Sequence, residues 1–157
     1  MARDRAKEVV RRFTASGKTL AAAESCTAGL AASLIACVPG ASRVLWGSWV
    51  CYTPEAKISM LGVAEALLRQ YGAVSRETAC AMALGALERS GAYCAFSVTG
   101  VAGPGADASG LPAGTVWIAT IRQGESAEAA CFRFRGSRNR VRLKAAEKAL
   151  DEIIKKI

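Results

Sequence analysis

The chain has 157 residues, of which 52% are apolar and 22% charged, with a net charge of +8 and no histidine. This length is enough for one globular domain, residues 1–157, to bury a core without disulfides. The composition excludes a membrane-spanning helix, because no apolar run reaches about 20 residues. It also excludes nucleophiles that depend on a histidine base within the chain.

Hydrophobic periodicity predicts helices that alternate with short strands. Thr53 and Pro54 form a helix start, and Ser75 is a second N-cap. In chain order we expect a helix over residues 3–16, a strand over 19–23, a helix over 29–37, a strand over 44–52, helices over 54–62, 64–71 and 76–90, a strand over 95–99, a long loop over 100–114, an antiparallel hairpin over 115–122 and 128–135, and a helix from 137 to the C-terminus.

This order predicts an α/β fold, a three-layer α/β/α sandwich around a mixed, mostly parallel sheet of about five strands. Ligands in such folds bind beyond the strand ends. The loops near Ser25, Thr53 and Gly100 each follow a predicted strand. We therefore expect the functional site where these three loops meet.

Ser25 is the leading candidate nucleophile. It ends an apolar run and is followed by Cys26, Thr27 and then Gly29, which opens a second apolar run. Such a pattern places a hydroxyl at a strand end beside a helix N-terminus. Cys26 remains an alternative nucleophile, which thiol-blocking reagents would reveal.

Without histidine, the natural activator of Ser25 is a lysine with a lowered pKa. Lys57 fits, because it lies in the first turn of the helix capped by Thr53, where the helix dipole disfavours an ammonium group. Tyr52 is placed to relay a proton or orient the amine. An ordinary surface lysine at position 57 is the alternative that the local sequence leaves open.

Two further features suit an anionic ligand. The glycine-rich loop from Thr99 to Asp107 lacks the Walker A and dinucleotide patterns, yet its amides can form an anion nest. Arg138 and Arg142 share one face at the start of the last helix, which suits a phosphate group. Solvation of an exposed face is the alternative for the arginines.

The six cysteines have no C-x-x-C spacing, so we expect reduced thiols and no metal site. The basic stretch at residues 133–144 lacks interleaved aromatic residues, so we do not expect nucleic acid as the partner. The charged N-terminal segment has no apolar signal-peptide region. We expect a cytoplasmic protein that does not associate with membranes.

Five segments in order, residues 24–29, 47–61, 71–75, 98–104 and 112–117, resemble one known family over roughly residues 4–155. It is the CinA C-terminal domain, also called PncC, the nicotinamide-nucleotide amidases. The chain resembles the stand-alone form, without the second domain related to molybdopterin-binding folds. The resemblance implies hydrolysis of the carboxamide of nicotinamide mononucleotide to nicotinate mononucleotide and ammonia, in pyridine nucleotide salvage, without a cofactor. A homodimer is also expected.

The resemblance places the catalytic serine at Ser25, the lysine at Lys57 and the tyrosine at Tyr52. It also implies a set of substrate contacts at Thr27, Gly29, Gly47, Thr99, Gly100, Gly103, Arg138 and Arg142. The chain departs from the family pattern at Ala28, at Thr53-Pro54 and over residues 105–111. These departures affect the substrate loops more than the serine–lysine pair. A non-catalytic nucleotide- or nucleic-acid-binding module with the same fold is the alternative function.

Overall fold

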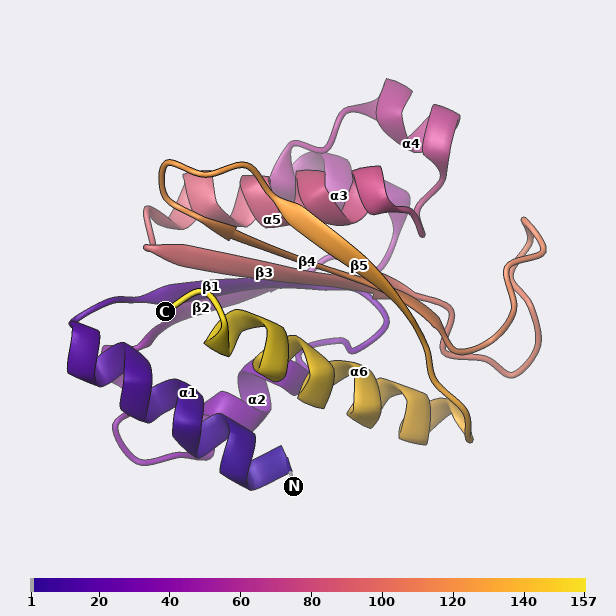
Figure 1. The fold of residues 1–157 in the computed structure, drawn as a ribbon. Helices are drawn as coiled ribbons and strands as arrows, with labels where there is room; N and C mark the ends of the chain where they lie inside the picture. The colour runs from indigo at the N-terminus through magenta and orange to yellow at the C-terminus, as the bar shows by residue number, and fades with distance from the viewer. Residues whose placement is uncertain (1) are drawn as a thin grey trace.

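A five-stranded mixed sheet in the order β2-β1-β3-β4-β5 lies at the centre of the molecule (Figure 1). The structure, a computed structural model, describes residues 2–157. The strands are β1 (Leu20–Glu24), β2 (Leu45–Val50), β3 (Cys94–Gly100), β4 (Thr115–Arg122) and β5 (Glu128–Arg133). Strands β2, β1 and β3 are parallel, whereas β4 and β5 extend the sheet as an antiparallel hairpin. The mixed sheet expected from the sequence is confirmed.

Helices cover both faces of this sheet (Figure 1). One layer contains α1 (Ala2–Ser16), α2 (Leu30–Ala36) and α6 (Arg138–Ile154), and the other contains α3 (Pro54–Leu61), α4 (Glu65–Tyr71) and α5 (Arg76–Ser90). A 3-10 turn, η1 (Ala41–Arg43), precedes β2. A separate hydrophobic core fills each interface between helices and sheet. The predicted three-layer α/β/α architecture is confirmed.

Strand β1 is buried on both faces, which explains its continuous apolar sequence. Leu20 and Ala22 belong to the core beneath α1 and α6, while Ala21 and Ala23 belong to the core beneath α5. Parallel strands covered by helices on both sides show this pattern. Glu24, the last residue of β1, is also fully buried.

The parallel register brings three strand ends to one edge of the sheet. Glu24 is opposite both Val50 of β2 and Val98 of β3. The Ser25 N–H donates to the Val98 carbonyl at 2.8 Å, and the Cys51 N–H donates to the Glu24 carbonyl at 2.8 Å. The residues that follow each strand therefore lie at the same level, as the sequence predicts.

Capping residues define where two helices near this edge, α3 and α5, begin. The Thr53 hydroxyl accepts from the Ala56 N–H at 3.2 Å, and Pro54 occupies the first turn of α3. The Ser75 hydroxyl accepts from the Thr78 N–H at 3.1 Å at the start of α5. Because an N-cap satisfies an otherwise unpaired amide, these positions fix where the helices begin.

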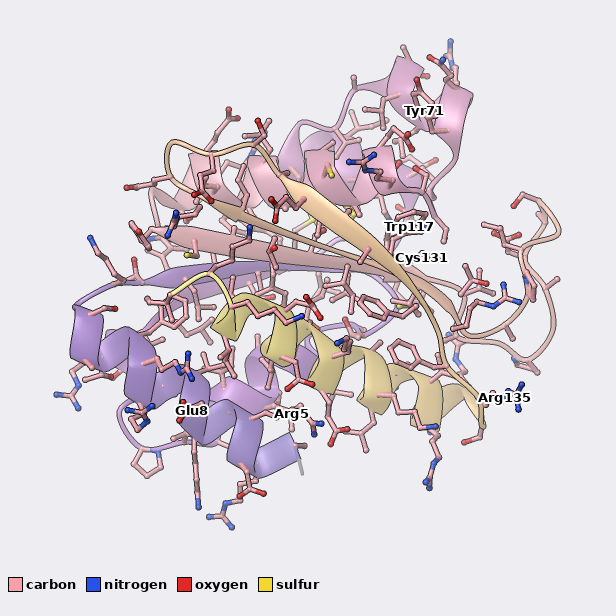
Figure 2. All side chains as sticks on the ribbon, in the orientation of Figure 1. Arg5, Glu8, Tyr71, Trp117, Cys131 and Arg135 are labelled. Carbon is pink, nitrogen blue, oxygen red and sulfur yellow. The ribbon has the colours of Figure 1, made fainter. Side chains whose placement is uncertain are left out.

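The segment between β3 and β4 extends beyond the sheet at the end where α6 begins (Figure 1). Arg135 lies at this same end of the molecule (Figure 2), just after β5. The N–H groups of Val101 and Gly114 bond to the carbonyls of Thr115 and Val101, respectively, which closes the base of the loop. The loop is therefore held beside the strand ends. Among residues 2–157, no helix is both long and apolar enough to cross a bilayer.

Candidate active site

Ser25 lies directly after β1 at the edge of the sheet, and its side chain is almost fully buried. Its carbonyl accepts from the Ala28 N–H at 3.0 Å, so the chain turns sharply after the strand. Gly29, with φ 88°, completes this turn before α2 begins. The turn places the Ser25 hydroxyl at the floor of a cavity.

Lys57 reaches Ser25 from α3. Its Nζ is 2.9 Å from Ser25 Oγ and donates to the Cys51 carbonyl at 3.0 Å. Lys57 is only 1% exposed, and no ion pair within residues 2–157 involves it. Burial lowers its pKa below the usual 10.5, with weaker opposing effects from Cys51 and Cys26. The arrangement holds an amine that can accept the Ser25 proton.

A cavity of about 300 Å³ opens above this pair. Its lining includes Ser25 and Lys57 on the floor, with Tyr52, Gly103 and Arg138 from three different segments. Its volume is at the lower end of the range for small-molecule sites. The cavity can therefore hold a small molecule next to the Ser25 hydroxyl.

Arg138, at the start of α6, connects the walls of the cavity. Its guanidinium donates to the Gly103 carbonyl at 2.5 Å and to the Tyr52 hydroxyl at 2.6 Å. Tyr52 is 52% exposed and its hydroxyl faces Arg138, so it lies at the mouth. Among the described residues, no hydrogen bond joins Tyr52 to Lys57.

The glycine-rich loop forms one wall of the cavity. Thr99 lines it but donates its hydroxyl to the Ala73 carbonyl at 2.7 Å, which fixes the segment before α5. Gly100 packs against β4 so closely that a Cβ would lie 2.7 Å from the Thr115 carbonyl oxygen. Gly103 has φ 90° and precedes a cis peptide bond to Pro104. Both glycines are therefore required by the backbone of the wall.

Four of the predicted substrate contacts do not line the cavity: Thr27, Gly29, Gly47 and Arg142. Thr27 is fully buried, and its hydroxyl has no hydrogen-bond partner within residues 2–157. Gly47 lies in the middle of β2. Arg142 points to the backbone behind Ser25, donating to the carbonyls of Cys26 and Thr27 at 3.1 Å each.

Cys26 lines the same cavity, but its environment disfavours a thiolate. Burial raises the pKa of its thiol to about 11. Ser25 contacts the lysine amine, whereas no hydrogen bond joins the Cys26 thiol to Lys57 within residues 2–157. The geometry favours Ser25 over Cys26 as the group that Lys57 activates.

Glu24 supports the turn in a way that sequence reasoning missed. Its buried carboxylate accepts from the N–H groups of Ala31 and Ala32 at 3.0 and 2.9 Å, at the start of α2. A carboxylate at the end of a buried apolar strand must be paired, which was the available signal. The other missed group is the Cys51 carbonyl, a backbone atom that no side-chain pattern reveals.

No cluster of three or more histidine, cysteine, aspartate or glutamate residues suited to a metal ion occurs within residues 2–157. Fold and site together define an α/β protein in which a buried serine–lysine pair lies at the carboxyl ends of parallel strands, beneath a glycine-rich loop. Within that class, the chain belongs to the CinA C-terminal domain family, whose model matches residues 2–157.

Relatives and solved structures agree with this assignment. A "CinA-like protein" of Geobacter metallireducens is 45% identical over 143 residues, which cover 91% of this chain and 34% of that protein. A putative competence-damage inducible protein of Symbiobacterium thermophilum is 50% identical over 116 residues, covering 74% of this chain and 27% of that protein. The chain thus spans about a third of the length of the curated relatives it matches.

Among solved structures, the competence/damage inducible protein CihA of Agrobacterium tumefaciens has a TM-score of 0.94 and 39% identity, with 98% of this chain and 94% of that chain covered. A CinA superfamily protein of Klebsiella pneumoniae has a TM-score of 0.96 and 31% identity, with 99% and 97% covered. The fold is therefore shared over essentially the whole chain.

Proposed function

We propose that this chain is an amidohydrolase that deamidates nicotinamide mononucleotide to nicotinate mononucleotide and ammonia, in pyridine nucleotide salvage. The observation that carries the proposal is the 2.9 Å contact between Lys57 Nζ and Ser25 Oγ, made by a lysine that is 1% exposed. The family resemblance indicates the substrate, and the serine–lysine pair supports acyl-transfer chemistry.

In the reacting form, Lys57 is a neutral amine and Ser25 donates its proton to the Lys57 lone pair. One Lys57 N–H continues to donate to the Cys51 carbonyl, which fixes the direction of the amine. The Ser25 oxygen attacks the carboxamide carbon, and the resulting oxyanion is stabilised by backbone N–H groups. Protonated Lys57 returns its proton to the leaving nitrogen, and ammonia departs. Water, deprotonated by Lys57, then hydrolyses the ester and restores Ser25.

Arg138 is the cation that we propose binds the substrate phosphate. It lines the cavity, and its two observed acceptors, Gly103 and Tyr52, are neutral groups that a phosphate can displace. A charged hydrogen bond to phosphate is stronger than either of these. Tyr52 then remains at the mouth as a contact for the rest of the nucleotide.

The decisive experiment is ammonia release from nicotinamide mononucleotide by the wild type, Ser25→Ala and Lys57→Ala. We expect wild-type activity and a loss of at least about 1,000-fold in each variant, because nucleophile and base act as a unit. Thermal unfolding should show that Ser25→Ala remains folded.

Cys26→Ser is the matched control beside the nucleophile, and it should retain most of the activity. Full activity of Ser25→Ala, or a dead Cys26→Ser that folds normally, would refute the serine assignment. Salt-dependent binding of nucleic acid without any ammonia release would instead favour a binding module.

We further propose that the protein acts in the cytoplasm as a homodimer, with a nucleotide as its small-molecule partner. Its six cysteines are all free thiols, as a reducing compartment maintains them. The dimer is supported by exposed large side chains, such as Trp46 and Val50, on the β2 edge.

A further inference from the structure

We propose that Asp107 is a specificity residue, whose carboxylate accepts hydrogen bonds from the ribose hydroxyls of the nucleotide and selects a ligand with a free 2′,3′-diol. This inference rests on the proposed nucleotide ligand and assigns the contact that its sugar makes. Asp107 lies within residues 105–111, where the chain departs from the family pattern. The contact is thus a property of this chain and not one that the resemblance implies.

Asp107 is the only acidic residue within residues 2–157 that lines the cavity above Ser25. The other ionisable groups of opposite sign in the lining are Lys57 on the floor and Arg138. A carboxylate in this wall repels the phosphate that we assign to Arg138. It therefore requires hydrogen-bond donors from another part of the ligand.

The hydrogen bonds of Asp107 leave one carboxylate oxygen for a ligand. Its N–H donates to the Leu111 carbonyl at 2.9 Å, and its carbonyl accepts from the Gly110 N–H at 3.0 Å. Its Oδ1 accepts from the Ser109 N–H and hydroxyl at 3.0 and 2.7 Å, and from the Leu111 N–H at 2.9 Å. Its Oδ2 has no hydrogen bond within residues 2–157 and remains accessible to solvent. Oδ2 is therefore the acceptor available to a ligand.

The same bonds keep the Asp107 carboxylate ionised and fixed in the absence of a ligand. The hydrogen bond from the Ser109 hydroxyl holds the pKa of this carboxyl below its usual 3.8, with support from the N–H groups of Leu111, Ser109 and Gly110 and some opposition from desolvation. An aspartate that bonds its own backbone in this way has little rotational freedom left to lose on binding. A charged acceptor also forms stronger hydrogen bonds than a neutral one.

Asp107 lies where the cavity meets a second one. On the same loop, the Gly103 carbonyl is bonded to Arg138, and Asp107 follows four residues later. Asp107 also lines a neighbouring cavity of about 500 Å³, with Ala73 and Val74 common to both linings. This junction leaves room for a sugar beside the loop.

The ribose supplies the donors that this carboxylate requires. In the proposed pose the carboxamide lies at Ser25 and the phosphate at Arg138, so the sugar lies between them. The pyridinium ring and an ionised phosphate have no N–H or O–H to donate, whereas the two vicinal hydroxyls have one each. Carboxylates accept from ribose hydroxyls in dinucleotide-binding folds for the same reason. A ligand phosphorylated on this diol loses a donor and adds repulsion, so we expect it to be rejected.

The test compares ligands that differ in the sugar or in the charge of the ring. Titration calorimetry measures binding to the Ser25→Ala protein, which leaves the carboxamide intact, with Asp107 either present or changed to Asn. Asparagine keeps an oxygen acceptor for the loop and removes the negative charge. The ligands are nicotinamide mononucleotide, its 2′,3′-dideoxy analogue and its reduced dihydro form, whose ring is uncharged. Glu88→Gln, an exposed acid outside the cavity lining, is the control for net charge.

We expect Asp107→Asn to weaken the binding of nicotinamide mononucleotide about tenfold, the difference between a charged and a neutral hydrogen bond. The reduced form should lose the same factor. The dideoxy analogue should bind about tenfold more weakly when Asp107 is present, and Asp107→Asn should change its affinity by less than about twofold. Glu88→Gln should leave all three affinities within about twofold. A loosened loop would instead weaken all three ligands alike.

Ammonia release from nicotinamide mononucleotide, with Ser25 intact, is measured in parallel. Asp107→Asn should raise KM about tenfold and leave kcat within about twofold, because the contact is made equally in the ground and transition states. The expected binding pattern without ammonia release by the wild type refutes the proposed activity alone. Ammonia release with an unchanged KM in Asp107→Asn refutes the diol contact alone.

Equal losses for nicotinamide mononucleotide and its dideoxy analogue would overturn the inference. A loss that disappears with the reduced form would also overturn it, since the carboxylate would then serve the charge of the ring. Should Asp107→Asn fail to fold, the protein with Asp107 decides, because equal affinity for the two ligands contradicts a diol contact. A folded protein that binds none of these nucleotides and releases no ammonia refutes both proposals.

Discussion

At the scale of single residues, the proposed chemistry depends on where Lys57 is buried. An exposed lysine is protonated at neutral pH and cannot act as a base. Here the amine is enclosed at the sheet edge, with Ser25 and the Cys51 carbonyl as its hydrogen-bond partners. Desolvation disfavours the ammonium form and lowers the Lys57 pKa. In the proposed mechanism, the burial that positions the amine also makes it a base.

We predict that kcat/KM rises with pH along an acid limb that reports the Lys57 pKa and has its midpoint below 10.5. Because the Lys57 pKa is lower in the folded protein, the unfolded chain binds more protons at pH values between the folded and unfolded pKa. The free energy of unfolding therefore also increases with pH over this interval. Lys57→Met should remove this part of the pH dependence of stability, measured by urea unfolding at several pH values.

Lys57→Arg is the charge-retaining control, and it should be inactive at every pH because a guanidinium stays protonated. Activity that is independent of pH from mildly acidic to alkaline conditions would contradict the role of Lys57 as base.

At the scale of elements, the connection from β1 to α2 is short and under conformational constraint. Ala28 has φ 50° and Gly29 has φ 88°, two successive residues in left-handed conformations. Ala28 is the only residue other than glycine with positive φ within residues 2–157. Its side chain is exposed and outside the cavity lining, so the effect of this methyl group falls on the backbone rather than on the ligand.

We predict that Ala28→Gly increases the free energy of unfolding by up to about 1 kcal/mol, because relief of left-handed strain exceeds the entropy gained by the unfolded chain. Urea unfolding measures the change. The matched control is Ala36→Gly, an exposed alanine at the C-terminal end of α2, where glycine adds only unfolded-chain entropy and should lower the free energy of unfolding by less than about 1 kcal/mol. Equal destabilisation by both substitutions would show that Ala28 is not strained.

At the scale of the whole molecule, one edge of the sheet differs from the rest of the surface. Strand β2 is an edge strand with no charged residue and no proline. Trp46 and Val50 on this strand, Tyr52 just after it and Met60 on α3 are exposed large side chains. Such an edge readily pairs with another strand. Because β2 itself carries no charged residue, pairing along it brings no like charges of the two strands together in a chain of net charge +8.

We predict that the wild type sediments at the mass of two chains and that Trp46→Lys shifts it to one, because a lysine on the edge opposes strand pairing. Analytical ultracentrifugation across a concentration series measures this. Leu143→Lys, at an exposed position on α6, is the control and should leave the mass unchanged. Wild-type protein that remains monomeric throughout would contradict the proposed dimer.

Much of the fold could be predicted because its signals are local. Thr53 with Pro54, and Ser75, set the starts of α3 and α5 through bonds within four residues. The apolar run before Glu24 indicates a strand covered on both faces. The proximity of Ser25 and Lys57 was also predictable, since a lysine is the natural activator where histidine is absent and local capping placed one near a strand end.

Other features were decided only when distant segments came together. The sequence placed Arg138 and Arg142 on one helix face and assigned them the same role. The structure separates them by their contacts, since Arg138 faces the cavity while Arg142 bonds the Cys26 and Thr27 carbonyls more than 110 residues away along the chain. Composition and spacing thus determined which groups are available for chemistry. Packing of α6 against the turn decided which of them face the ligand, because backbone carbonyls become binding partners only after the chain has folded.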